Sequence, residues 1–207
     1  MANHWLFQRI FFDRSPRIAA VAGVERNAIQ TGLDLIPIRW YFRVKVGGCM
    51  KFVTTRFGEI DCNENDVIIL PKGILGFSQL TRYVIIEKEE AAPFKWFQSV
   101  EDPNVAFVVM DPLKVFPNYK LEIDERELEE LNYASSKDLI TYVIVTVPQD
   151  ATQASADLLG PLVINARKRL AKQAVMSNSP YTTRHYLLDE FKKRSRRKYL
   201  NRKASAQ

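Results

Sequence analysis

The first 49 residues differ from the rest of the chain in how hydrophobic and polar positions alternate. Within them, residues 18–24 are apolar but form a short run, and residues 33–46 suit either one strand or an irregular helix. From Met50 onward, clusters of apolar and β-branched residues recur and are separated by turn residues. The change predicts a folded domain over residues 50–187, preceded by a disordered or loosely attached extension over residues 1–49.

The clusters in the folded body have the composition of strands. They are rich in β-branched and aromatic residues and are bounded by residues such as Gly and Pro, which favour turns. A glycine-containing turn is predicted over residues 72–76 and a basic turn over residues 166–172. Residues 51–60 suit either one strand or a hairpin bent at Gly58. The other predicted strands span residues 66–70, 83–86, 94–100, 105–110, 142–147, 161–165 and 173–176.

The clearest helix signal lies between two of these strands. Asp124 can cap the first turn, and Glu127 three residues later completes the pattern of a capping box. The helix is predicted from Glu125 to about Asn132, and a second short helix over residues 77–81. Many short strands with one or two short helices predict a mainly β fold, either a small antiparallel β-barrel or a domain of packed sheets.

Charge is distributed unevenly along the chain. Residues 50–187 hold fifteen Lys and Arg against nineteen Asp and Glu, whereas the counts are seven against three in residues 1–49 and eight against two in residues 188–207. The net charge of +6 therefore comes from the two ends and not from the folded body. The sequence holds neither an apolar run of membrane-spanning length nor the order of a secretory signal, so we expect a cytoplasmic protein.

Residues that usually carry catalysis or bind metals are scarce. The chain has two histidines, His4 and His185, and two cysteines, Cys49 and Cys62. Ser99 has acidic neighbours but lies in a strand-like segment and not on a nucleophile elbow. Soft ligands are too few for a zinc site, although carboxylates alone can hold a hard ion, and the sequence holds neither a P-loop nor a dinucleotide-binding motif. We therefore expect no enzymatic activity, no metal and no cofactor.

Acidic stretches in the body and a basic tail are the remaining candidates for function. The acidic residues suit either a solvated helix face or a docking surface for a basic protein, because complementary charge speeds encounter and disfavours wrong partners. Residues 188–207 suit either a solvated tail or a segment that binds phosphate groups. The candidate partner-binding residues are Glu101, Asp102, Glu122, Asp124, Glu125, Glu127, Glu129 and Glu130.

Seven ordered blocks within residues 50–187 match the motifs of one known protein family. The longest block, residues 93–107, is the most specific, and residues 70–77 resemble the family's Pro-x-Gly-Leu-Pro-Gly-Phe turn. Leu75 stands where the family usually has proline, and Asp157 where it often has asparagine. The other blocks are residues 57–60, 145–148, 156–165, 172–175 and 181–187. Residues that match family motifs are Gln98, Ser99, Val100, Pro161, Asn165, Tyr181, Arg184 and His185. With these seven blocks in order, residues 50–187 resemble the FliW family of flagellar assembly factors.

The resemblance implies a regulator that acts by binding other proteins. FliW-like proteins bind newly made flagellin in the cytoplasm and, once flagellin is exported, bind CsrA, a small dimeric RNA-binding protein. CsrA represses flagellin translation, and its capture by a FliW-like protein lifts that repression. An RNA-binding target is basic, which favours the docking interpretation of the acidic residues. The resemblance also implies that Tyr181, Arg184 and His185 lock the last segment of the domain in place, and it implies no small-molecule substrate.

Three expectations complete the interpretation. The main alternative function is a nucleic-acid-binding β domain that acts through residues 188–207. Trp96 is expected in the core, because it alternates with its neighbours in a strand that is largely aromatic. Met50 is expected to be the true start. The resemblance begins there, and the codons of the glycine pair before it can spell a bacterial ribosome-binding site.

Overall fold

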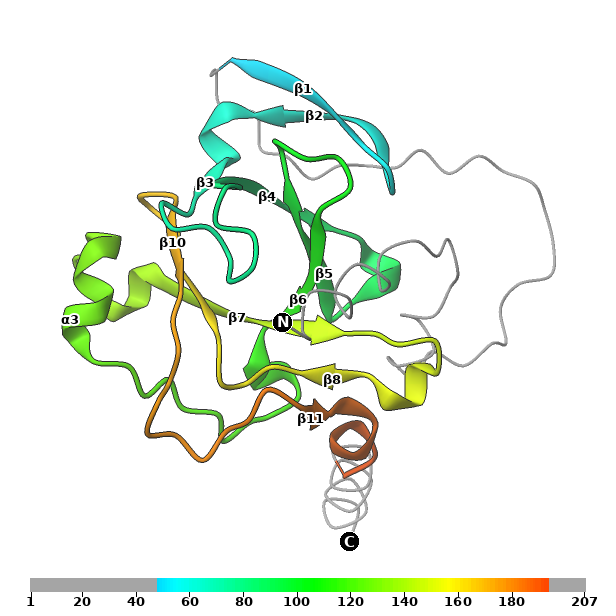
Figure 1. Cartoon of the computed structure of the whole chain (residues 1–207), viewed down its shortest axis with the longest axis vertical. Helices are drawn as coiled ribbons and strands as arrows, with labels where there is room; N and C mark the ends of the chain where they lie inside the picture. Colours follow the sequence, from blue (N-terminus) through cyan, green and yellow to red (C-terminus); the bar gives the residue numbers. More distant parts are fainter. Residues whose placement is uncertain (1–47, 194–207) are drawn as a thin grey trace, which may run out of the picture.

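Short strands that would not be stable alone pair with one another in a closed sheet (Figure 1). The computed structural model describes residues 48–193. Its strands are β1 (Cys49–Thr54), β2 (Gly58–Asn63), β3 (Ile68–Ile69), β4 (Arg82–Glu87), β5 (Phe94–Ser99), β6 (Ala106–Met110), β7 (Leu139–Thr146), β8 (Ser155–Ala156), β9 (Leu162–Asn165), β10 (Leu170–Gln173) and β11 (His185–Tyr186).

Seven of these strands form a barrel. Along the sheet they follow the order β7, β6, β5, β4, β3, β10 and β9, and β9 pairs with β7 to close the ring. Neighbouring strands are antiparallel, apart from the parallel pair β3 and β10. β8 and β11 extend the sheet beyond β7, and β1 and β2 form a separate hairpin. The prediction of a mainly β fold with a small barrel is therefore confirmed.

The barrel interior is filled by alternate residues of its strands. Tyr83 stacks on Phe97 with ring centroids 4.6 Å apart, and both are fully buried. The loop between β3 and β4 contributes Ile74 and Phe77 to the same cluster, and Phe77 meets Phe107 edge to face. Because aromatic side chains and an inserted loop occupy the space, the interior is a packed core.

The outer face of the barrel is also covered along much of its length. Trp96, which is 6% exposed, packs there against a large cluster that includes Ile60 and Cys62 of the β1–β2 hairpin. Phe57, at the tip of that hairpin, contacts the Trp96 ring edge to face at 5.3 Å. The expectation that Trp96 lies in the core is confirmed. Burial of both faces explains why β6 is apolar at all of its positions.

The predicted acidic helix exists but is short. α3 (Glu125–Leu128) is one turn long and continues as the 3-10 helix η4 (Glu129–Leu131). Asp124 accepts a hydrogen bond from the Arg126 backbone N–H, and Asn132 ends the segment with a left-handed φ of 49°. Leu128 and Leu131 pack on the outer face of β9, so tertiary packing holds a segment too short to be helical alone.

Two local predictions were wrong. Residues 77–81 form turns and not a helix, because Phe77 and Leu80 are inserted into the barrel. The second helical segment lies instead at residues 187–193. The predicted strand at 173–176 lies three residues earlier, at β10, since Arg169 takes a positive φ of 54° and ends the basic turn sooner than expected.

The structure describes only part of each chain end. Most of the predicted extension, residues 1–47, and most of the predicted basic tail, residues 194–207, lie outside the described residues. Cys49 and Met50 belong to β1 and pair with Asn63 and Cys62 of β2. A native start at Met50 stays a prediction. Within residues 48–193, no helix is long and apolar enough to cross a membrane.

Candidate protein-docking surface

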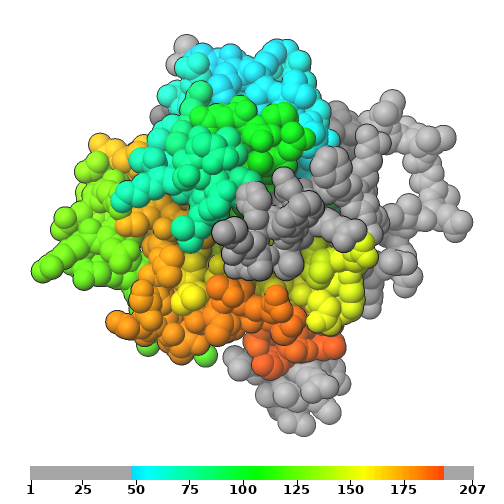
Figure 2. Space-filling model, in the orientation of Figure 1, coloured from blue at the N-terminus to red at the C-terminus, as the bar shows by residue number. Residues whose placement is uncertain are grey.

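The acidic segment around α3, residues 122–130, is exposed to solvent because its apolar residues face the barrel. Leu128 and Leu131 are buried against Val163, which forces the intervening side chains outward. Figure 2 shows this segment in yellow-green at one edge of the molecule, next to the orange β9–β10 region. The exposed carboxylates of the segment are those of Glu122, Asp124, Glu125, Glu127, Glu129 and Glu130.

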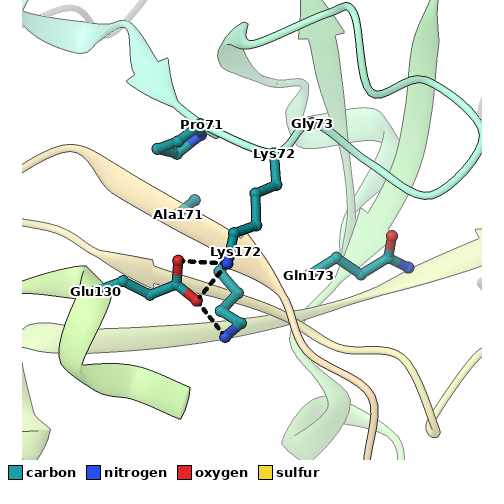
Figure 3. A pocket seen from close by; sticks show the side chains of 7 residues that line it. All are labelled: Pro71, Lys72, Gly73, Glu130, Ala171, Lys172 and Gln173. Atoms are coloured by element: carbon teal, nitrogen blue, oxygen red, sulfur yellow. Dashed lines mark hydrogen bonds and ion pairs between the residues drawn. The ribbon is translucent and has the colours of Figure 1, made fainter. Parts of the chain in front are cut away.

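Two lysines already neutralise part of this acidic surface. The Glu130 carboxylate accepts a hydrogen bond from Lys72 Nζ at 3.1 Å and another from Lys172 Nζ (Figure 3). These bonds, that of Lys172 foremost, hold the pKa of Glu130 below its ordinary value. Lys172 also donates to the Glu127 carbonyl at 2.7 Å. The side chains of Lys72, Glu130 and Lys172 line a recess together with Gly73. Their contacts link the acidic segment to β10 and to the loop after β3.

Other carboxylates of the segment have no such partner. Within residues 48–193, those of Glu122, Glu125 and Glu129 make neither a hydrogen bond nor an ion pair. Arg126 is exposed among them. The surface therefore keeps an excess of negative charge after its internal ion pairs are formed, and it lies on a segment fixed to the barrel.

Glu101 and Asp102 lie elsewhere and are engaged in the fold. Glu101 Oε2 accepts hydrogen bonds from the Thr81 backbone N–H at 2.6 Å and the Arg82 N–H at 3.0 Å. Asp102 Oδ1 accepts from the Asn104 backbone N–H at 2.9 Å. This β5–β6 turn lies beside the tip of the β1–β2 hairpin, away from α3 (Figure 1). The structure therefore does not bring these two residues together with the other six predicted docking residues.

The first group of motif residues shapes the β5–β6 turn. Gln98 is fully buried and its Nε2 donates to the carbonyl of Val105 at 3.0 Å and to that of Ser99 at 3.0 Å. Ser99 Oγ accepts from the backbone N–H groups of Glu101 and Asp102. Val100 is half-buried, and its N–H donates to the Arg82 carbonyl. These contacts orient the turn and need no ligand to explain them.

Asn165 connects the barrel to the acidic segment. Its Nδ2 donates to the carbonyls of Leu131 at 2.9 Å and Asn132 at 3.2 Å, and its Oδ1 accepts from the Arg167 N–H at 3.0 Å. The buried Pro161 immediately precedes β9, the strand that ends at Asn165, and its carbonyl accepts a hydrogen bond from the Ala174 N–H. Asn165 thus satisfies the carbonyls at the end of η4 and fixes the position of the carboxylates.

The third motif group lies where the last segment returns to the barrel. His185 Nε2 accepts a hydrogen bond from the Thr182 backbone N–H at 2.9 Å, and its ring meets Phe116 edge to face. Tyr181 OH accepts from the Lys120 N–H at 3.0 Å. Arg184 is exposed, and its backbone N–H donates to Thr182 Oγ1. The contacts of Tyr181 and His185 join this segment to residues 116–120, whereas the hydrogen bond of Arg184 stays within the segment.

We expect the His185 contact to make stability depend on pH. Burial lowers the pKa of His185 below its ordinary value of 6.5, and the carboxylates of Asp157 and Glu190 oppose that shift. A lowered pKa means that unfolding takes up a proton, so the contribution is complete above pH 6.5 and is lost as the pH falls below it. Chemical unfolding at pH 7.5 and 5.0 should show wild type losing stability relative to His185→Gln, which does not titrate. Parallel losses in the two proteins would contradict this.

Sequence reasoning missed the two lysines that bind Glu130. Lys72 and Lys172 are far from Glu130 along the chain, at separations of 58 and 42 residues. No local pattern signals such a contact, which depends on closure of the barrel. Within residues 48–193, no group of three or more His, Cys, Asp and Glu side chains is placed to hold a metal ion.

Comparison with known proteins decides the family. The model of the family described as FliW protein matches residues 51–187. The chain belongs to the FliW family. The flagellar assembly factor FliW of Natranaerobius thermophilus is 39% identical over 142 residues, covering 68% of this chain and 94% of that protein. FliW of Thermoanaerobacter pseudethanolicus is 40% identical over 144 residues, covering 69% of this chain and 96% of that protein.

A solved structure supports the same assignment. A crystal structure of the flagellar assembly factor FliW matches with a TM-score of 0.63 and 36% sequence identity, covering 67% of this chain and 96% of that chain. The match to the FliW fold agrees with the barrel described above. As a FliW family member, the chain is a flagellar assembly factor.

Proposed function

We propose that this protein binds flagellin and CsrA in alternation in the cytoplasm. While flagellin is present it occupies the protein, and when flagellin has been exported the free protein binds CsrA. Capture of CsrA relieves its repression of flagellin translation. The proposed action is stoichiometric binding between proteins, and it requires neither a cofactor nor a small-molecule substrate.

The unpaired carboxylates on the α3 segment are the observation that carries the proposal. CsrA is an RNA-binding protein and therefore offers a basic surface. Among the described residues, the carboxylates of Glu122, Glu125 and Glu129 are unpaired, whereas that of Glu130 is neutralised by lysines. Because the segment is pinned by Asn165 and by the buried Leu131, binding costs little ordering of the backbone. We assign CsrA docking to this surface and not to Glu101 and Asp102, whose carboxylates already bind the backbone.

Charge reversal at two unpaired positions tests this surface. Glu125→Lys with Glu129→Lys should weaken CsrA binding about tenfold or more at low salt, and the difference should shrink as salt is raised. The pair Glu127 and Glu130 is less suitable, since reversal at Glu130 would also repel Lys72 and Lys172. Titration calorimetry measures the affinity, and thermal unfolding checks that the fold is kept.

A matched control separates a local effect from a change in net charge. Glu89→Lys with Glu90→Lys makes the same charge change at two exposed residues of the 3-10 helix η2 (Glu89–Ala91). That variant should bind CsrA within about twofold of wild type, because the effect of an exposed charge fades over a Debye length. Equal losses in both double variants would reject the α3 surface as the site.

The basic tail supports a second candidate, which is direct binding of nucleic acid. Residues 188–207 carry eight Lys and Arg against two Asp and Glu. Phe191 packs against the core, so truncation after Lys193 removes tail charge and leaves that contact intact. Direct RNA binding should weaken steeply with salt and vanish in the truncated protein, whereas CsrA binding should survive truncation.

A further inference from the structure

Leu75 is an aliphatic side chain held out into solvent at the tip of a tight turn. It is 68% exposed, and it lies between Gly73 and Gly76, whose φ angles are +62° and +87°. An isolated β-bridge joins Ile74 to Phe77 across the turn. Turn tips are normally polar or glycine-rich, so a large apolar side chain is unusual at this position.

The turn is rigid on both sides of Leu75. Ile74 is 2% exposed inside the barrel, and Phe77 packs edge to face on Phe107 with centroids 5.2 Å apart. The Leu75 backbone N–H donates to Gln173 Oε1 at 2.9 Å, which ties the tip to β10. With its neighbours anchored and its own N–H bonded, the side chain is presented in a fixed place.

The tip lies on the same structural unit as the acidic segment. Lys72, three residues before Leu75, forms an ion pair with Glu130 at 2.9 Å, which links this loop directly to η4 (Figure 3). Leu75 therefore lies on a loop that an ion pair joins to η4, the element that also carries the unpaired Glu129.

We propose that Leu75 is an anchor that inserts into an apolar pocket on a basic protein partner, with the α3 carboxylates facing the positive rim of that pocket. A single exposed leucine is common on protein surfaces, so exposure alone does not indicate a binding site. Two features distinguish Leu75: it is held rigidly, and an ion pair joins its loop to the acidic segment. A buried apolar centre with a charged rim is the arrangement in which a few residues dominate binding. This inference rests on the proposed function, because it names the contact through which the basic partner is held.

Two substitutions at one position test the anchor. Leu75→Asn removes the apolar side chain but suits a turn, and Leu75→Met keeps a side chain of similar volume. With purified CsrA as the probe, Leu75→Asn should weaken binding about tenfold or more, while Leu75→Met stays within about threefold of wild type. Leu113→Asn, at another aliphatic residue that is 55% exposed, should bind as wild type does. All three variants should unfold at the wild-type temperature.

Each outcome of the titration has a distinct meaning. Wild-type affinity in Leu75→Asn overturns the anchor and leaves the proposed function standing. If Leu75→Asn loses flagellin binding and keeps CsrA binding, the assignment of a basic partner to this surface is overturned. If wild type binds no CsrA, the proposed function and the anchor both fail. Weaker binding in Leu75→Asn, restored in Leu75→Met, supports the anchor.

Discussion

Trp96→Ala is expected to lower the free energy of unfolding by about 3–5 kcal/mol, as is typical when a large aromatic side chain is removed from a core. Trp96 is 6% exposed, and Phe57 packs edge to face on its ring. Removing the indole leaves a cavity between β5 and the β1–β2 hairpin, and that hairpin is paired with no other strand among the described residues. Denaturant unfolding, followed by circular dichroism, measures the change.

A surface control shows whether the loss reflects burial. Leu113→Ala, at a residue that is 55% exposed, should change the free energy of unfolding by less than about 0.5 kcal/mol. If Trp96→Ala instead keeps the wild-type stability and loses partner binding, the residue acts in an interface and the packing described here is wrong.

Gly73→Ala is expected to destabilise the protein by about 3 kcal/mol or more, because two effects combine at this position. The backbone has a φ of +62°, which side-chain-bearing residues adopt at a cost. An added Cβ would also lie 2.5 Å from the Phe77 carbonyl oxygen and 2.7 Å from Ser78 Cα, both of which belong to the backbone. The loop that fills the barrel would have to move.

Gly76→Ala is the matched control for Gly73→Ala. It has a similar backbone conformation, with a φ of +87°, but an added Cβ would meet nothing within 4 Å. Only the conformational cost remains, so we expect a loss of about 1–2 kcal/mol. Equal losses in the two variants, measured by denaturant unfolding, would show that close packing under the turn contributes nothing.

The strands were predictable from sequence because their pattern is local. Alternation in residues 94–100 and the apolar run at 105–110 are visible without knowing what they contact, and they correspond to β5 and β6. Closure of the barrel was not predictable, since the pairing of β7 with β9 joins residues that are far apart in sequence. β8 and β11 were missed because two residues are too few to show a period.

The local features of the candidate site were predictable from sequence, and its tertiary contacts were not. The acidic helix was found because a cap and a run of carboxylates are adjacent in sequence, and Asp124 does cap it. The state of each carboxylate was not predictable, because Glu130 binds lysines from other elements and Glu101 binds the backbone of β4. Contacts of this kind arise from tertiary structure, and they decide which carboxylates are free for a partner.

Competition between the two partners tests the central claim most directly. A complex of this protein with CsrA is formed, purified flagellin is added in steps, and the species are separated by size-exclusion chromatography with detection of each component. Alternating binding predicts that flagellin displaces CsrA in a one-for-one exchange, and that no species contains all three proteins. A stable complex of all three, or CsrA that stays bound at saturating flagellin, would contradict the account.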